Sequence, residues 1–241
     1  HKPVIFFAYP NKPGSPVPPN AELHVLTRPE HDQAQALAAL AAELGNPPAV
    51  PAPSHGKTEP AKGAITSESF AQSLSALLPE NCIVCDESVT FGRAIYPNTQ
   101  GAAPHDWLSV TGGAIGGGIP LATGAAVAGA GRRVVNLEAD GSAMYTIQGL
   151  WTQAREQLDV TTVILNNGKY QILIGELANV GANPGRTAMD MLDLGNPGLD
   201  FVRIAAGMGV EGARATTMEQ FNDLFGASLT RKGPFLIELM I

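Results

Sequence analysis

Cysteine is scarce in this sequence: its 241 residues include only Cys82 and Cys85. Two cysteines are too few for a disulfide framework, and they predict a reducing compartment, the cytoplasm. The pair forms a CxxC inside the strand-like stretch NCIVCDES. Because a redox-active CxxC usually opens a helix, this placement favours packing in a core over thiol chemistry.

Basic residues are also few, with 15 Lys and Arg against 22 Asp and Glu and a formal net charge of −7. Such a balance repels phosphate backbones and provides no basic stripe, so we expect no nucleic-acid partner.

Charge is absent altogether from 108–131, but this stretch is rich in glycine and alanine and contains Pro120. We therefore expect a buried helix behind a glycine turn there, and no membrane span.

The N-terminal part of the sequence carries little regular pattern. Its opening, HKPVIFFAYPNKPG, has too short an apolar run for a signal peptide, and its first residue is His1, which is consistent with a processing boundary. Residues 3–9 resemble a strand and 30–44 a helix. Two elements cannot make a domain, so 1–45 is predicted to be the tail of a second α/β domain. Residues 46–63, dense in proline, are predicted to be a linker.

Strand-like and helical patterns alternate over 64–241, the predicted main domain. Its first helix, 66–78, is expected to begin after a Thr66 cap, with Ser69 in place of the usual Glu of a capping box. The other expected elements are strands 82–85, 133–138, 160–165, 210–215 and 234–240, helices 119–130, 146–157, 199–208 and 217–230, a glycine turn at 112–118 and a loop at 178–198. This alternation predicts an α/β fold: a parallel sheet with helices on both faces.

Polar residues follow two of the predicted strands at the point where each ends. Asp140 follows one strand, and Asn167 follows the next strand along the chain. Separately, each has a plain structural explanation, as a helix cap or a turn. Because ligands bind at the carboxyl ends of the strands in an open parallel sheet, their joint occurrence favours a shared site.

The oxygen ligands of this predicted site indicate a hard cation. One carboxylate and one amide oxygen, without His or Cys nearby, favour Mg²⁺ or Ca²⁺ over zinc. Mg²⁺ usually takes its remaining ligands from phosphate and water. Gly141 and Ser142 follow at the start of the next helix, where N–H groups and the helix dipole favour an anion. The pattern therefore predicts a metal-bridged diphosphate.

Asp-Gly-Ser, followed some two dozen residues later by Asn-Asn, resembles the metal–diphosphate motif of thiamine diphosphate (ThDP) enzymes. The whole of 64–241 resembles the diphosphate-binding domain of the acetolactate synthase and benzoylformate decarboxylase family, and 1–45 resembles the end of that family's middle domain. The resemblance implies Mg²⁺ ligation by Asp140, Asn167 and the main-chain carbonyl of Lys169. It also implies that Gly141, Ser142 and the Tyr170 backbone hold the diphosphate. The sequence departs from the family's Gly-Asp-Gly by having Ala139.

Three further segments extend the resemblance. In the family, the turn matching TGGAIGGGIPLATGAAVA holds the aminopyrimidine through the carbonyl at Gly113, and the side chain at Ile115 keeps the cofactor bent. Alone, this glycine cluster would also suit a dinucleotide loop, but HDWLSVTGG gives little sign of the strand that such a loop follows. At the end of the first strand, the Val89 backbone and Thr90 are implied to contact the diphosphate. Ile172 and Leu173 would face the substrate, and the loop containing Arg186 would close over it.

The resemblance implies ThDP- and Mg²⁺-dependent decarboxylation or carboligation of 2-oxo acids, as in acetolactate synthase, with the reactive chemistry supplied by the cofactor. The family's catalytic glutamate belongs to a pyrimidine-binding domain that this sequence lacks, so we expect no catalytic residue in this chain. Another chain or a missing segment would supply that domain, in a homodimer or homotetramer. A simple 2-oxo acid decarboxylase resembling benzoylformate decarboxylase remains an alternative, as does a non-catalytic nucleotide-binding module. FAD is left undecided.

Overall fold

The computed structural model describes residues 9–45, 48–49 and 58–241, which form two units. The smaller unit contains the described residues up to 49, together with 179–182. Its helix α1 (Gln33–Glu43) begins after Asp32, whose carboxylate accepts from the Gln35 N–H at 2.9 Å. This confirms a helix within 30–44. The strand predicted over 3–9 lies outside the described residues except at Tyr9, which is not in a strand.

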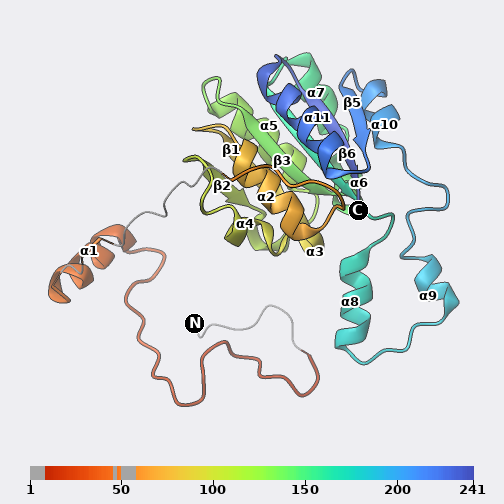
Figure 1. Ribbon diagram of the computed structural model, residues 1–241. Helices are drawn as coiled ribbons and strands as arrows, with labels where there is room; N and C mark the ends of the chain where they lie inside the picture. Colours follow the sequence, from red (N-terminus) through yellow and green to blue (C-terminus); the bar gives the residue numbers. More distant parts are fainter. Residues whose placement is uncertain (1–8, 46–47, 50–57) are drawn as a thin grey trace. The chain divides into compact units, whose positions relative to one another are not determined.

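The larger unit is built on a six-stranded parallel sheet in the order β2-β1-β3-β4-β6-β5 (Figure 1). Its strands are β1 (Ile83–Glu87), β2 (Asp106–Ser109), β3 (Val134–Ala139), β4 (Val160–Asn166), β5 (Glu211–Ala215) and β6 (Phe235–Met240). Every residue of the central strand β4 is buried. Burial on both sides of a strand requires cover on both faces of a parallel sheet, and the predicted fold class is confirmed.

Helices supply that cover. The helices described after residue 58 are α2 (Ser67–Leu77), α3 (Val89–Gly92), α4 (Ile95–Asn98), α5 (Gly118–Ala128), α6 (Asp140–Thr146), α7 (Gly149–Arg155), α8 (Gln171–Asn179), α9 (Arg186–Asp190), α10 (Phe201–Gly207) and α11 (Met218–Thr230). One face of the sheet packs against α2 and α11 through Phe70, Phe221 and Phe225. The other packs against α5, α7 and α10 through Ile119 and Leu150, among others. Figure 1 shows α2 and α11 together in front of the sheet.

The cap predicted for the first helix of this unit is confirmed. The Ser69 N–H donates to Thr66 Oγ1 at 3.1 Å, and the Thr66 N–H donates to Ser69 Oγ at 2.8 Å. Serine is therefore long enough to close the box that glutamate usually closes.

The sequence patterns missed several elements. Strand β2 was not predicted because it lies at the edge of the sheet and most of its residues are exposed, so apolar residues do not mark it. Helix α9 lies within the predicted loop 178–198, and α8 precedes it; neither buries a residue. The helix predicted over 146–157 is preceded by α6, which begins directly after β3. Because β2 ends at Ser109, just before the glycine turn, the expectation of little strand there was wrong.

The two cysteines lie in the core, as predicted. Both are fully buried, and neither forms a disulfide within the described chain. Burial raises the pKa of Cys82 to about 11 and that of Cys85 to about 12, so both thiols stay protonated.

The uncharged stretch 108–131 forms the end of β2, the glycine turn and α5. Across the described residues, no helix combines the length and apolar character that spanning a bilayer requires.

An ion pair joins the start of β4 to the start of β6. Asp159 accepts from Lys232 Nζ and from the Gly233 N–H, both at 2.8 Å. Burial raises the pKa of Asp159, but the Lys232 and Gly233 donors outweigh it, and the pKa lies below its usual value. A lowered pKa stabilises the fold above the unfolded-state pKa, and the gain is lost as pH falls through the folded-state pKa.

We expect Asp159→Asn to lower the free energy of unfolding by about 1 kcal/mol at pH 7, because a charged hydrogen-bond acceptor is lost. The difference from wild type should shrink as pH falls below the unfolded-state pKa of about 3.9 and through the lower folded-state pKa of Asp159. Urea unfolding of both proteins at pH 7 and at pH 3 measures this difference in the free energy of unfolding. An equal loss at both pH values would contradict this account.

Candidate functional site

Asp140 and Asn167 lie at the ends of adjacent strands. β3 and β4 pair in parallel with Ala139 opposite Leu165, so the next residues of both strands meet at one edge of the sheet. Asp140 Oδ2 accepts from the Asn167 N–H at 3.1 Å and from the Gly168 N–H at 2.7 Å. The structure therefore brings the predicted acid and the predicted amide-containing turn into direct contact.

The Asp140 carboxylate is buried and held by backbone donors. Burial raises its pKa above the usual value, whereas the N–H groups of Gly141, Asn167 and Gly168 oppose the shift. The Gly141 N–H donates to Oδ1 at 2.8 Å. Because each carboxylate oxygen has two lone pairs, Oδ1 keeps one for a further partner. A cation would favour the charged form of this carboxylate.

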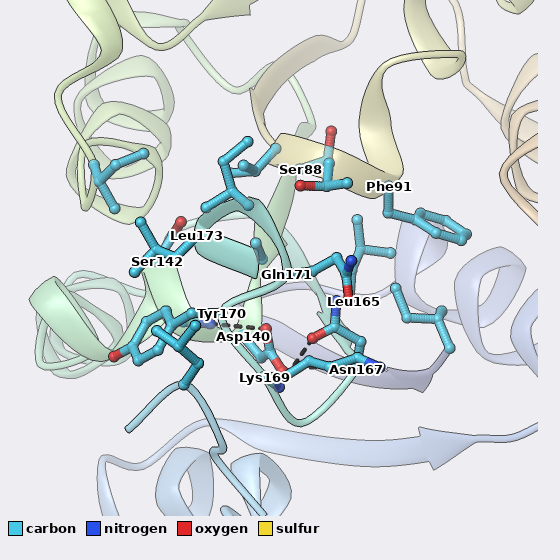
Figure 2. Close-up of a pocket in the computed structure, with 18 of the residues that line it drawn as sticks. Ser88, Phe91, Asp140, Ser142, Leu165, Asn167, Lys169, Tyr170, Gln171 and Leu173 are labelled. Atoms are coloured by element: carbon cyan, nitrogen blue, oxygen red, sulfur yellow. Dashed lines mark hydrogen bonds between the residues drawn. The ribbon is translucent and has the colours of Figure 1, made fainter. Parts of the chain in front are cut away.

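The turn after β4 presents two more oxygens. Asn167 Oδ1 accepts from the Lys169 N–H at 3.0 Å, and the Lys169 carbonyl accepts from the Gln171 N–H at 2.9 Å. Each of these oxygens has one further lone pair. Figure 2 shows Asp140, Asn167 and Lys169 together on one side of the pocket. A carboxylate, an amide oxygen and a carbonyl are ligands that Mg²⁺ accepts.

The described residues offer no group of three or more His, Cys, Asp or Glu side chains suited to a metal ion. A hard cation would therefore rely on one carboxylate with neutral oxygens. A site of this kind needs further oxygen ligands from phosphate or water.

A cavity of about 350 Å³ opens beside these oxygens. Among the sequence-predicted site residues, its walls include Val89, Thr90, Ile115, Asp140, Gly141, Ser142, Asn167, Lys169, Tyr170, Ile172 and Leu173. Gly113 lies in a second cavity, of about 430 Å³, which shares Ser88, Val89 and Ile115 with the first. Arg186 lines neither cavity; its side chain is almost fully exposed and pairs with Asp190.

Sequence reasoning missed several wall residues of the first cavity: Phe91, Tyr145, Gln171, Met191, Leu192 and Ile241. Met191 and Leu192 belong to the loop that was expected to cover the site, so the loop contributes to the wall through residues other than Arg186. No sequence motif marks an apolar residue that lies in a loop or at the end of a strand. Only the fold brings these side chains to the cavity.

Two features after β1 fit a ligand in the cavity. Thr90 Oγ1 is buried without a hydrogen-bond partner among the described residues. An unpaired buried hydroxyl costs free energy unless a ligand or water pairs with it. Val89 has φ +50°, which is unusual for a β-branched residue. Strained backbone of this kind clusters at functional sites.

The glycine turn is anchored to β1 by a buried carboxylate. Glu87 accepts from the Gly116 N–H at 2.6 Å and from the Gly118 N–H at 2.5 Å. Glu138 lies beside it, and burial, followed by the charge of Glu87, raises the pKa of Glu138 well above its usual value. Neither glutamate was predicted to act here. Their strand positions gave no hint that the turn's N–H groups would face them.

Glycine is required where Tyr170 packs on the start of α6. A Cβ at Gly141 would lie 2.5 Å from the Tyr170 ring. The two predicted diphosphate residues are therefore in contact, with the ring covering the first turn of the helix.

A family model described as "Thiamine pyrophosphate enzyme, C-terminal TPP binding domain" matches residues 91–239, which include Asp140 and Asn167. Thiamine pyrophosphate is another name for ThDP. This chain belongs to the ThDP enzyme family. This membership confirms the resemblance, supports ThDP as the cofactor and disfavours the alternative of a nucleotide-binding module.

Relatives in the ThDP family include both enzyme types considered above. The chain is 54% identical over 243 residues to the "Putative acetolactate synthase large subunit IlvX" of Mycobacterium tuberculosis, a match that spans 99% of this chain and 47% of that protein. It is 33% identical to the benzoylformate decarboxylase of Pseudomonas aeruginosa over 73% of this chain and 32% of that enzyme. The chain thus spans half or less of the length of these relatives.

A solved structure resembles the fold closely. The ThDP-dependent 4-hydroxybenzoylformate decarboxylase of Rhodococcus jostii superimposes with a TM-score of 0.68 at 31% identity. The match covers 86% of this chain and 38% of that one. The fold therefore has the architecture of a ThDP-binding domain.

Proposed function

We propose that this chain is the diphosphate- and Mg²⁺-binding part of a ThDP-dependent enzyme that decarboxylates a 2-oxo acid and joins the product to a second carbonyl compound, as acetolactate synthases do. The observation that carries the proposal is the contact between Asp140 and the Asn167 turn at the cavity. The 54% identity to a protein named as an acetolactate synthase large subunit supports this reaction type.

The residues present fit the cofactor and the metal. Asp140, Asn167 and the Lys169 carbonyl would hold Mg²⁺. Gly141, Ser142 and the Tyr170 backbone, with Val89 and Thr90, would hold the diphosphate; Gly113 and Ile115 would hold the aminopyrimidine. Ile172 and Leu173 would face the substrate. When bound, ThDP supplies the electron-accepting carbon that lets a 2-oxo acid lose CO₂.

The remaining parts of the enzyme follow from the same proposal. A pyrimidine-binding domain would come from another chain or from a segment outside this sequence, with its catalytic glutamate. A homodimer or homotetramer is supported by exposed apolar side chains on neighbouring helices, namely Val127, Tyr145 and Trp151. A cytoplasmic location is supported by two unpaired cysteines.

Simple decarboxylation of an aryl 2-oxo acid is the second candidate. The similarity to the benzoylformate and 4-hydroxybenzoylformate decarboxylases favours it. So does the apolar part of the cavity wall, which includes Phe91, Ile172 and Leu173.

Calorimetric titration of the chain with ThDP tests the proposed function. We expect binding in the presence of Mg²⁺ that weakens at least about tenfold when EDTA removes the metal, because the diphosphate then loses its bridge to Asp140. The chain by itself should not decarboxylate pyruvate or benzoylformate appreciably. In the complete assembly, acetolactate formed from pyruvate favours the first candidate, and benzaldehyde formed from benzoylformate favours the second. Absence of ThDP binding would refute the proposal.

A further inference from the structure

A completely buried carboxylate, Glu238 of β6, connects three neighbouring strands. Its Oε1 accepts from Asn166 Nδ2 at 2.7 Å. Its Oε2 accepts from Arg214 Nε at 3.0 Å and Nη2 at 2.9 Å. Strand pairing places Glu238 opposite Arg214 of β5 on one side and Ile164 of β4 on the other. A buried charge is costly unless it is paired and hydrogen-bonded, and both conditions are met here.

Asn166 links Glu238 to the turn after β4, which carries proposed metal ligands. Its Oδ1 accepts from the Gly168 N–H at 3.0 Å, and the same N–H donates to Asp140 Oδ2 at 2.7 Å. A side-chain amide has donors at one end and an acceptor at the other. With Nδ2 facing Glu238, Oδ1 must therefore face Gly168. If the amide turned over, its NH₂ group would face the Gly168 N–H and the contact would be lost.

We propose that Glu238 is a positioning residue for the metal site: by fixing the orientation of the Asn166 amide, it holds the Gly168 N–H between Asn166 and Asp140. The inference rests on the proposed function, because Asp140 and Asn167 are the proposed metal ligands. It assigns a task to a residue that lines neither cavity. Partners behind a metal ligand typically change metal affinity by about 10–100-fold when they are removed.

The carboxylate is required because both of its neighbours donate. In Glu238→Gln, the new amide can offer an acceptor to Asn166 or to Arg214, but it must point N–H groups at the other. We expect the Gly168 amide to exchange with deuterium at least about tenfold faster in this variant, with no cofactor added. Mg²⁺-dependent ThDP binding should weaken by about 10–100-fold.

A compensating pair of substitutions separates positioning from general loss of stability. In Asn166→Asp combined with Glu238→Gln, the carboxylate and the amide change places. The new Gln can then donate to the new Asp and accept from Arg214, while the Asp accepts from Gly168. In this double variant, exchange at Gly168 should return to within about threefold of wild type. In the single variant Asn166→Asp, two carboxylates lie together, and Gly168 should exchange faster than in wild type.

Ser228→Ala provides the matched control. Ser228 is buried and accepts from Thr161 Oγ1 of β4 at 3.0 Å, so its removal also breaks a buried hydrogen bond on that strand. It should leave exchange at Gly168 and ThDP binding as in wild type. Normal Gly168 exchange in Glu238→Gln, or no recovery in the double variant, would overturn the inference. If the wild-type chain bound no ThDP, the proposed function would be wrong, but exchange at Gly168 would still decide the role of Glu238.

Discussion

Asp140→Ala will weaken Mg²⁺-dependent ThDP binding by at least about 100-fold, or about 2.7 kcal/mol. Asp140 is the single carboxylate among the proposed ligands, so its loss removes the charge that neutralises the cation. The substitution also removes the acceptor of the Asn167 N–H and one of the two acceptors of the Gly168 N–H, which loosens the turn that carries the other two ligands. Calorimetric titration with ThDP at saturating Mg²⁺ measures the loss.

Asp140→Asn distinguishes lost charge from a damaged fold. Asparagine keeps the size of the side chain and one acceptor oxygen, so the thermal unfolding midpoint should change less than in the alanine variant, while ThDP binding remains impaired. Asp190→Ala is the control, because Asp190 is exposed and lines neither cavity. Wild-type binding in both Asp140 variants would remove this residue from the metal site.

Gly116→Ala should reduce the free energy of unfolding by about 3 kcal/mol. Gly116 is buried with φ +91°, a conformation that L side chains rarely adopt, and an added Cβ would lie 2.5 Å from Cβ of Tyr145. The Tyr145 Cβ is fixed to its own backbone and cannot rotate away. Relief would require movement of the turn, which would break the Gly116 N–H bond to Glu87. Urea unfolding followed by circular dichroism measures the change.

Gly124→Ala is the matched control for this prediction. Gly124 lies inside α5, is exposed, and has open space where a Cβ would stand. Alanine there should stabilise the protein by up to about 1 kcal/mol, because glycine is a poor helix former. Equal effects of the two substitutions would show that the turn has no special backbone requirement.

The contact between Asp140 and the Asn167 turn was predictable because it depends on topology. Parallel strands end at the same edge of a sheet, so polar residues at consecutive strand ends are brought together whatever the intervening helix contains. The ThDP motif added residue types at the right spacing. The cap at Thr66 was predictable for a similar reason, since all of its partners lie within one helical turn.

Other parts of the site depend on contacts that no local pattern encodes. Glu87 was passed over because its partners, Gly116 and Gly118, lie about 30 positions further along the chain. The positive φ of Val89 was not predictable, since β-branched residues normally avoid it. The placement of Gly113 in the second cavity follows from the shape of the turn. The edge strand β2 escaped detection because exposure removes the apolar signal.

The anchoring of the glycine turn by Glu87 makes the two rims of the cavity unequal. The rim formed by 112–118 is tied to the sheet through a buried side chain, and its atoms should show small amplitudes of motion. The rim beside α9 contains Met191 and Leu192, which follow α9, a helix without a single buried residue. We therefore expect small molecules to enter and leave past the α9 rim, while the glycine rim acts as a fixed wall.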